Sequence, residues 1–536
     1  MGKTSLYIAL HFFGVYVSYG QQQTYFVQFK DKNASGFSVD HPQNFLSSRA
    51  LARREKCLVS VDEKDLPVVQ SYIDQLVLAG AQCIYPLKWF NGVVVLSDVT
   101  VKNQLAALSF VSSVDVSVVF RKANTDATQS LVCETNMLSD FGSAFHQNDM
   151  LGNVQMNRDG YSGKGIRIAI TDDGFLNVNS NAGFTSLFQN GQILSTHDLI
   201  DLDNSVYAQG GGHGAEVFSI LAGTLTGQFS GPAVSAEFML FRTEDVASES
   251  PLEELNWVRA AEIADSAGVD IIQVSLGYST FDDASLNHTW SDLDGQTSYI
   301  SKGASIAYAK GLIVVASAGN EGASPWRKIL CPADVDGVLS VGAVDYDEQR
   351  TSFSSVGNSY DGRIKPDVMA MGAGVVYIGT DGILKSGGGT SFASPLMSGL
   401  VAGLLEAHPT LSHKEILFAI KQSSDRYTSP DSLYGYGIPN YAKASNYAKL
   451  LEDNESAYVY PNPFGADLNL KVPASDVGKL LDWNLYSAAG EKVATAQQVI
   501  STMAVSLWSD SSGLSSGVYF LKVSIEGTFQ VFKVIK

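Results

Sequence analysis

The sequence is poor in cysteine and in basic residues. Four cysteines are spread over 536 residues, which is too few and too scattered for a disulfide scaffold or a zinc site. The 36 lysines and arginines stand against 55 aspartates and glutamates, which leaves a formal net charge of -19. A chain this acidic is not expected to bind nucleic acid or an anionic membrane surface.

Long apolar runs are scarce as well. Beyond residue 20 no segment approaches about 18 uninterrupted apolar residues, so we expect no membrane-spanning helix. Residues 1–20 combine Lys3, the short apolar run 6–17 and small residues at Ser18 and Gly20, which is the pattern of a secretory signal peptide. The sequence therefore predicts an exported, acidic protein. A length of 536 residues suffices for about three domains.

Glycine-rich stretches, in contrast, stand at the ends of several apolar runs. Residues 387–395 read GGGTSFASP and pass into the helical pattern 396–407, so Ser391 lies where a loop becomes a helix. Glycines let the backbone approach a ligand closely, and a helix N-terminus favours developing negative charge. A serine hydroxyl placed there can act as a nucleophile if a base is near. The alternative is a glycine turn with a capping serine or threonine.

Two further stretches supply a base and an acid. The β-branched run 166–170 leads to Asp172 before a glycine turn, and His213 lies between the glycines 210–212 and an apolar run. An imidazole can take the proton of a serine hydroxyl near neutral pH. A carboxylate can fix the tautomer of that imidazole and stabilise its charged form. Asp172, His213 and Ser391 are thus candidates for orienter, general base and nucleophile.

A fourth stretch supplies a donor for a developing oxyanion. The apolar run 312–316 is followed by Asn320, and acyl transfer needs hydrogen-bond donors aimed at the tetrahedral oxyanion. The side-chain amide of Asn320 can provide one donor, and the backbone N–H of Ser391 can provide another.

The motifs follow one another in a set order. In that order they resemble the subtilisin-like serine proteases (peptidase family S8), over roughly 140–447. The resemblance implies that Asp172, His213 and Ser391 hydrolyse peptide bonds through an acyl-enzyme, with Asn320 as the oxyanion donor. The motifs are DDG at 172–174, HGAEV at 213–217, SLG at 275–277, AGN at 318–320 and GTSFASP at 389–395.

Two positions depart from the family pattern. The family often has Ser or Thr where Asp173 stands, and Thr-His where this chain has Ala215 and Glu216. Neither departure removes an atom of the triad. A second carboxylate beside Asp172 can shift the pH optimum, in a direction that the sequence leaves open.

By the same resemblance, two segments bind the substrate. One supplies a strand edge that pairs with an extended peptide, and the other supplies the opposite wall of the pocket for the residue before the cut bond. Both consist of small or apolar residues without a carboxylate, and a preference for a large apolar residue is our hypothesis. The edge comprises Ser275, Leu276 and Gly277, and the wall comprises Ser317, Ala318 and Gly319.

The resemblance implies no cofactor for the chemistry. The family often binds structural calcium, and the loop between Asp172 and His213 is rich in side-chain oxygens that suit this ion. No fixed ligand spacing is present there, so a solvated loop is favoured over a calcium site. The oxygen-bearing residues are Asn177, Asn179, Asn181, Asp201 and Asp203.

The segment 24–122 has its own β-α-β-β-α-β pattern, including an Asn91-Gly92 hairpin turn. This order predicts a small ferredoxin-like domain. Standing before a subtilisin-like domain, it resembles the family's propeptide, which implies an intramolecular inhibitor and a maturation cut in the linker 123–139. The alternative is a domain that stays attached as a substrate-binding module.

The remaining segments complete the predicted organisation. Alternating strand-like and helix-like runs over 140–447 predict a doubly wound parallel α/β sheet. After a linker at 448–457, the segment 458–536 shows short strands with glycine turns, typical of a small β-sandwich. It resembles the C-terminal sorting domain of the type IX secretion system through PNP at 461–463, SAAG at 487–490, GVYFL at 517–521 and the terminal KVIK.

The sorting-domain resemblance implies a Gram-negative source and a protein that is released or attached at the cell surface. The alternative is a carbohydrate-binding or adhesive domain. Taken together, the sequence predicts a secreted serine endopeptidase made as a zymogen, with protein or peptide substrates, its own propeptide and the secretion machinery as partners. The alternatives are a non-catalytic surface binding protein on a protease fold, and an esterase or peptide ligase with the same triad.

Overall fold

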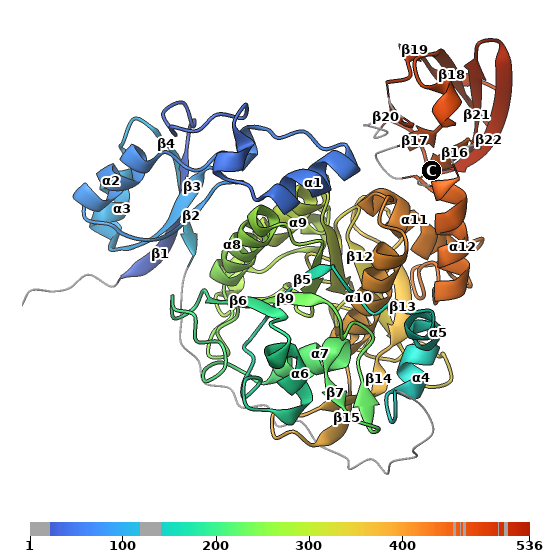
Figure 1. The fold of residues 1–536 in the computed structure, drawn as a ribbon. Coiled ribbons are helices and arrows are strands. Elements are labelled where there is room, and N and C mark those ends of the chain that lie inside the picture. The colour runs from blue at the N-terminus through green and yellow to red at the C-terminus, as the bar shows by residue number, and fades with distance from the viewer. Residues whose placement is uncertain are drawn as a thin grey trace, which may run out of the picture.

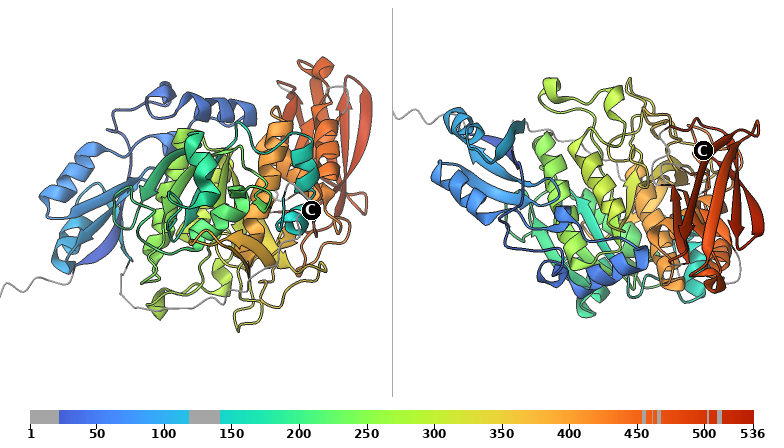
Figure 2. Two further views of the ribbon diagram at one scale, coloured as in Figure 1. Left: turned by 60° about the horizontal axis from the view of Figure 1, so that its bottom comes forward. Right: turned by 90° about the horizontal axis from the view of Figure 1, so that it is seen from above.

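The computed structural model describes residues 22–117, 141–453, 457–460, 462–464, 468–501, 503–508 and 513–536. They form a small N-terminal domain, a large central domain and a C-terminal domain (Figure 1). The two small domains lie at opposite ends of the central one in all three views (Figures 1 and 2). The predicted signal peptide, Cys133 and the predicted maturation linker lie outside the described residues.

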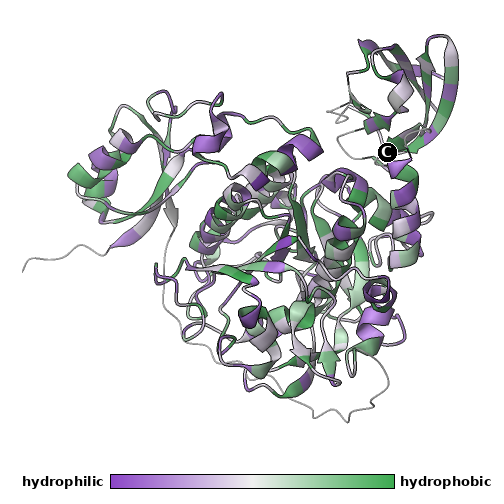
Figure 3. Cartoon of the chain, viewed as in Figure 1, coloured by the Kyte–Doolittle hydropathy of each residue, from purple (hydrophilic) through white to green (hydrophobic). Residues whose placement is uncertain are grey.

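The central domain is built on a seven-stranded parallel sheet with the order β13-β12-β11-β10-β5-β9-β6. Its inner strands are buried on both faces and are rich in isoleucine and valine, as parallel strands covered by helices require. Figure 3 shows apolar residues gathered along these strands and along the helix behind them. The strands are β5 (Arg167–Asp172), β6 (Ile193–Asp198), β9 (Glu237–Arg242), β10 (Ile271–Val274), β11 (Ile313–Ser317), β12 (Leu339–Val344) and β13 (Val368–Met371).

Helices cover both faces of this sheet. The helices α7 (His213–Ala222) and α10 (Thr390–Ala407) pack on one face, and α8 (Pro251–Ala267) and α9 (Tyr299–Ala309) pack on the other. The helix α8 begins in a capping box formed by Ser250 and Glu253, and Gly268 ends it at φ +81°. The predicted doubly wound α/β fold is therefore confirmed.

Smaller elements fill the rim of the central domain. The loop predicted between Asp172 and His213 is not only loop, because it contains β6 and α6 (Thr185–Gln189). Buried and exposed residues do not alternate regularly along β6, so its sequence lacks the alternation of apolar and polar residues that predicts a strand. The other elements are α4 (Phe145–Asp149), α5 (Asn153–Arg158), β7 (Thr224–Leu225), β8 (Phe229–Ser230), β14 (Ala373–Ile378), β15 (Leu384–Gly388), α11 (His413–Ser423) and α12 (Tyr441–Glu452).

The N-terminal domain has the predicted ferredoxin-like topology. Its antiparallel sheet has the order β2-β3-β1-β4, and α2 (Gln70–Leu78) and α3 (Val99–Ala106) provide its two helices. The additional helix α1 (Ser48–Cys57) was not predicted; it lies over α8 of the central domain (Figure 1). The strands are β1 (Gln23–Phe29), β2 (Gln82–Leu87), β3 (Gly92–Ser97) and β4 (Val111–Ser117).

The C-terminal domain packs two antiparallel sheets around one apolar core, as predicted. The helix α12 reaches Glu452, so it runs into the stretch predicted as a linker. Among the residues described above, no helix has the length and apolar character needed to cross a membrane. One sheet holds β16 (Tyr458–Tyr460), β17 (Leu468–Lys471) and β20 (Ala504–Trp508), and the other holds β18 (Leu480–Ser487), β19 (Lys492–Val499), β21 (Val518–Ile525) and β22 (Thr528–Ile535).

Candidate active site

Three of the predicted residues meet at the carboxyl end of the central sheet. Asp172 is the last residue of β5, His213 the first of α7 and Ser391 the second of α10. His213 Nδ1 lies 2.8 Å from Asp172 Oδ1, and His213 Nε2 lies 3.0 Å from Ser391 Oγ. Both distances lie in the range of hydrogen bonds, so an acid, a base and a hydroxyl are joined by one continuous chain of hydrogen bonds.

A glycine lets α7 approach β5 closely enough for this contact. A Cβ on Gly214 would lie 2.3 Å from the carbonyl oxygen of Gly174 and 2.8 Å from the Cβ of Asp172. Any side chain here would push the start of α7, and with it His213, away from Asp172. The glycine that follows the histidine in the sequence motif therefore has a packing role.

The second carboxylate, Asp173, lies beside the first. Its backbone N–H donates to Asp172 Oδ1 at 2.9 Å, and its own Oδ1 accepts the N–H of Gly214 at 3.1 Å. Burial and the neighbouring charge of Asp172 raise the pKa of Asp173 to about 7. Asp173 is thus close enough to influence the histidine electrostatically.

Opposing effects determine the pKa of the His213 imidazole. Burial alone would lower its pKa, but the charge and hydrogen bond of Asp172, together with Asp173 and Glu216, raise the pKa of His213 to about 9. The imidazolium, which is the form that exists after the base has taken a proton, is therefore more stable here than in a free histidine.

The amide of Asn320 is oriented by its neighbour Thr390. Asn320 Oδ1 accepts hydrogen bonds from the N–H and the hydroxyl of Thr390, at 2.9 and 3.0 Å. Its Nδ2 is then the end that faces the site: a Cβ built on Gly389 would lie 3.6 Å from this nitrogen and 2.8 Å from Ser391 Oγ. The Ser391 N–H is among the first N–H groups of α10, which lack acceptors within a helix. Two donors thus stand near the hydroxyl.

The predicted substrate edge follows β10. Ser275 is buried, and its hydroxyl donates to the carbonyl oxygen of Ser391 at 2.7 Å. Leu276 and Gly277 are half-buried, and within the described part of the chain their backbone N–H and C=O groups have no hydrogen-bond partner. Free backbone groups beside a nucleophile are what an added peptide strand needs.

The predicted opposite wall is largely occupied by internal contacts. Ala318 is fully buried, and its N–H and C=O bond to Val341 and Leu330. Ser317 is also buried, and Gly319 donates its N–H to the hydroxyl of Thr390 at 3.1 Å. This segment can therefore form a wall of the pocket, but it has few free backbone groups to pair with a substrate.

Leu330 stands between the two segments and was not predicted from the sequence. A Cβ on Gly277 would lie 2.8 Å from Leu330 Cβ, and a Cβ on Gly319 would lie 2.7 Å from Leu330 Cγ. The Leu330 side chain is half-buried. A leucine therefore occupies the space between two small-residue walls, which counts against the expected preference for a large apolar residue. No motif marks Leu330, because only the fold brings it there.

The loop that was the candidate for structural calcium does not gather its oxygens. Asn181 Oδ1 accepts the N–H of Gly183 at 2.9 Å, and Asp201 pairs with Arg242 at 2.6 Å. Among the described residues, no three or more His, Cys, Asp and Glu side chains stand where they could hold a metal ion. Asn181 and Asp201 are therefore engaged in contacts within the protein, which favours a loop held by its own hydrogen bonds.

The N-terminal domain is fixed to the central domain by buried charges. Asp265, near the end of α8, is fully buried, and Arg54 Nη1 and Nη2 each lie 3.0 Å from one of its carboxylate oxygens. Arg53 also bonds Asp265, and Lys88 Nζ lies 3.5 Å from it. The cations come from the N-terminal domain and the anion from the central one.

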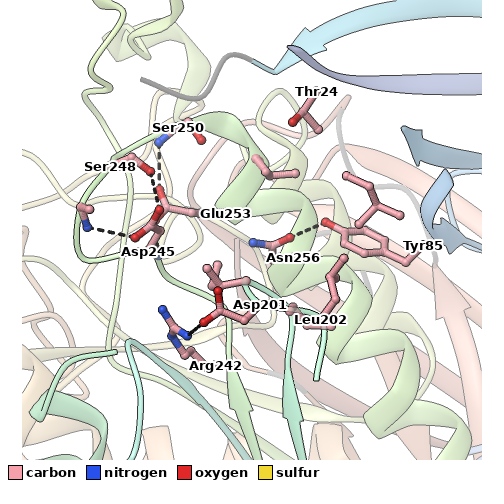
Figure 4. Close-up of a pocket in the computed structure, with 15 residues that line it drawn as sticks. Thr24, Tyr85, Asp201, Leu202, Arg242, Asp245, Ser248, Ser250, Glu253 and Asn256 are labelled. Atoms are coloured by element: carbon pink, nitrogen blue, oxygen red, sulfur yellow. Dashed lines mark hydrogen bonds and ion pairs between the residues drawn. The ribbon is translucent and has the colours of Figure 1, made fainter. Parts of the chain in front are cut away.

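A cavity of about 410 Å³ lies between the same two domains. Figure 4 shows Thr24 and Tyr85 of the N-terminal domain on one side, facing Asn256 and Leu202 of the central domain. The Tyr85 hydroxyl donates to Asn256 Oδ1. None of the predicted catalytic, oxyanion or substrate-binding residues lines this cavity, and its walls come from both domains.

Comparisons with known proteins agree with this arrangement. The sequence model described as the subtilase family matches residues 163–437, the one described as the peptidase S8 propeptide domain of Bacteroidota matches residues 24–131, and the one described as the secretion system C-terminal sorting domain matches residues 458–536.

Several bacterial proteases are similar to the chain. Subtilisin DY of Bacillus licheniformis is 30% identical over 294 residues, which cover 53% of this chain and 93% of that protein. Subtilisin NAT of Bacillus subtilis subsp. natto is 28% identical over 53% of this chain and 67% of its own length. Serine protease AprX of Bacillus subtilis is 25% identical over 57% of this chain and 70% of its own length.

Proposed function

The chain belongs to the subtilase family and is a serine endopeptidase made with a propeptide, and we propose that Asp172, His213 and Ser391 are its catalytic residues. The observation that carries this proposal is the pair of hydrogen bonds, 2.8 and 3.0 Å, that join the three side chains. Hydrogen-bond contact between nucleophile, base and orienting acid is the requirement for activating a serine.

In the proposed mechanism, Ser391 Oγ attacks the carbonyl carbon of the scissile bond while His213 Nε2 takes its proton. Asp172 stays ionised, accepts the Nδ1–H and stabilises the imidazolium. His213 then gives the proton to the leaving amine, and an ester to Ser391 remains. A water molecule, deprotonated by His213, attacks this ester and releases the second product.

We propose that Asn320 Nδ2 and the Ser391 N–H bind the oxyanion of each tetrahedral intermediate. This role fits the orientation of the amide, because Thr390 occupies its oxygen. Donors fixed before the reaction need no reorganisation when the negative charge develops, and this is why they lower the barrier.

The substrate is proposed to lie as an extended strand along Ser275, Leu276 and Gly277, with Ser317, Ala318 and Gly319 opposite. Leu330 then limits the pocket for the residue before the cut bond, since its side chain stands between Gly277 and Gly319. We therefore propose a preference for small side chains, such as alanine, at that position of the peptide.

The propeptide domain provides an intramolecular inhibitor and the sorting domain a link to secretion. As finer assignments we propose domain bounds of 24–122, 140–447 and 458–536, with a maturation cut in 123–139. The sorting domain indicates export to the cell surface or medium. We propose a Gram-negative source and export by the type IX system.

No cofactor is needed for catalysis in this family. We propose that the loop after β5 is held by its own hydrogen bonds rather than by calcium, so that a chelator leaves the melting temperature unchanged. The rival reading, a non-catalytic binding protein on a protease fold, is not favoured.

The test compares the purified chain with its Ser391→Ala variant on casein, followed by intact mass. We expect the wild type to cleave casein and to lose its N-terminal domain, while the variant does neither. Circular dichroism should show that both proteins are folded. Casein cleavage by the folded variant would contradict the assignment of Ser391.

A further inference from the structure

The free backbone edge at Leu276 and Gly277 is tied down at both of its ends. On one side, Ser275 donates to the carbonyl oxygen of Ser391 at 2.7 Å. On the other side, the Tyr278 hydroxyl donates to Glu244 Oε2 at 2.6 Å. The first tie belongs to the nucleophile helix, whereas the second leads to a loop that no motif had marked.

Tyr278 is suited to fix this end of the edge. It is 1% exposed, and its N–H and C=O pair with Cys331 at 3.0 and 3.2 Å. The backbone of Tyr278 is therefore held from one side by Cys331, and its ring is held from the other side by Glu244. Loss of either contact would let the two residues before it move.

Glu244 connects Tyr278 to the catalytic acid. Its Oε1 accepts the hydroxyl of its neighbour Thr243 at 2.7 Å, and the Thr243 N–H donates to the carbonyl oxygen of Asp172 at 3.0 Å. Three strand ends are thus joined in sequence: β10 through Tyr278, β9 through Thr243 and Glu244, and β5 through Asp172.

The loop that carries Glu244 is itself fixed. Glu253, in the first turn of α8, accepts the N–H of Asp245 at 2.9 Å and the N–H of Ser250 at 2.8 Å. Figure 4 shows Glu253 between these two residues. Asn256 Nδ2 also donates to the carbonyl oxygen of Thr243 at 3.0 Å. Glu244 therefore stands on a support that does not depend on the substrate.

No Lys, Arg or His side chain within the described residues forms an ion pair with Glu244. Burial, opposed by the hydroxyls of Tyr278 and Thr243 and reinforced by Glu249 and Asp172, raises the pKa of Glu244 to about 8. A carboxyl used as a hydrogen-bond partner rather than as half of an ion pair is consistent with a role in positioning.

We propose that Glu244, acting through Tyr278, is a positioning residue that holds the Leu276–Gly277 edge in the place where it pairs with substrate residues upstream of the cut. This inference rests on the proposed function of that edge. A misplaced edge weakens binding of an extended peptide, but it leaves Ser391, His213 and Asp172 in contact. The effect should therefore grow with the length of the substrate.

The experiment uses the mature enzyme and two chromogenic anilides that share the residue before the cut bond, chosen as the one the wild type cleaves best. One anilide carries that residue alone, and the other carries three more residues upstream. The variants are Tyr278→Phe, Glu244→Ala and Glu244→Gln. The control is Tyr434→Phe, which loses a hydroxyl that accepts the Arg350 N–H at 3.1 Å outside this network.

For Tyr278→Phe and Glu244→Ala we expect a KM about tenfold higher on the long anilide, with kcat nearly unchanged, and less than a twofold change on the short one. Glu244→Gln retains an acceptor oxygen and should keep most of the long-substrate advantage. The double variant Tyr278→Phe/Glu244→Ala should be no worse than Glu244→Ala alone, because both substitutions remove the same hydrogen bond between Tyr278 and Glu244.

Equal losses on the two anilides, or none, would overturn the inference, as would the same length effect in Tyr434→Phe. If Tyr278→Phe does not fold, Glu244→Ala compared with Glu244→Gln decides the question. Failure of the wild type to cleave casein or either anilide would instead count against the proposed function. The two failures are therefore distinguishable.

Discussion

The side-chain oxygen of Asn320 accepts two hydrogen bonds from Thr390, one from its N–H at 2.9 Å and one from its hydroxyl at 3.0 Å. Thr390 is fully buried and immediately precedes Ser391. The residue beside the proposed nucleophile therefore determines which end of the amide faces the reacting carbonyl.

Replacing Asn320 by alanine should lower kcat by about 10²–10³ with little change in KM, because the lost donor acts on the transition state. That magnitude is the one measured for such a donor in a subtilisin. Steady-state kinetics on a peptide anilide provide the measurement. A raised KM at unchanged kcat would mean that the amide binds the substrate instead.

Thr390→Val should show a smaller loss of kcat, about tenfold, since one of two orienting hydrogen bonds is removed. Thr390→Ser keeps the hydroxyl and serves as the matched control. If Ser and Val behave alike, the hydroxyl does not orient Asn320.

Asp173 gives a prediction about pH. His213 acts as a base only when neutral, and negative charge on Asp173 contributes to the pKa of about 9 at His213. Asp173→Asn removes this charge, so the pKa of His213 falls and the acid limb of kcat/KM moves to lower pH. The gain should be greatest above pH 7, where Asp173, with a pKa of about 7, is ionised in the wild type.

A profile of kcat/KM from pH 5 to 10 measures this shift. The exposed substitution Asp482→Asn in the C-terminal domain is the control, and it should leave the profile unchanged. An acid limb that stays in place or moves upward in Asp173→Asn would show that Asp173 does not act on His213.

Leu330 gives a prediction about specificity. The wild type should cleave after alanine in preference to phenylalanine, and Leu330→Gly should raise the ratio of kcat/KM for phenylalanine over alanine at least tenfold, because a side chain is removed from the pocket. Leu330→Ala should give an intermediate ratio without adding the backbone freedom of glycine. A wild type that already prefers phenylalanine would contradict the proposed role of Leu330.

Asp265 gives a prediction about the propeptide. In Asp265→Asn, Arg53 loses its buried carboxylate while Arg54 keeps Asp65, and an uncompensated buried charge costs about 3–5 kcal/mol. The propeptide should therefore leave the enzyme more readily after processing. Size-exclusion chromatography of the processed protein measures how much propeptide stays bound. Equal retention in wild type and variant, with equal melting temperatures, would rule out the anchor.

The same contact predicts a dependence on pH. Burial would raise the pKa of Asp265, but Lys88, Arg53 and Arg54 reverse this effect and lower it. Because its pKa is lowered, the ionised Asp265 stabilises the complex at pH values above the ordinary carboxyl pKa of about 4. This stabilisation is lost as the pH falls further and Asp265 takes up a proton. As far as Asp265 determines it, the fraction of propeptide that stays bound should be constant from pH 7 to 5 and should fall below about pH 4.

Strand ends and helix starts could be predicted from the sequence because their signals are local. The run before Asp172 is β-branched and buried, and glycines precede both His213 and Ser391, so each residue could be assigned to the end of an element. The parallel sheet followed from the alternation of strands and helices. The four proposed catalytic and oxyanion residues all lie at or near element ends that these patterns had marked.

Other features depend on contacts that no local pattern records. The helix α1 was missed because Arg53 and Arg54 are among its few buried residues, and their buried partner belongs to another domain. Leu330 and Glu244 were missed because they reach the site from loops that lie 61 residues before Ser391 and 31 residues after His213 in the sequence. Long-range packing, not composition, determines their roles.

The most direct test of the account is reaction of the mature enzyme with a fluorophosphonate, which labels an activated serine, followed by peptide mapping. We predict a single label on Ser391, its loss in Ser391→Ala, and strong suppression in His213→Ala, where the base is missing. A label on a different serine, or labelling that persists in Ser391→Ala, would contradict the proposal that Ser391 is the nucleophile.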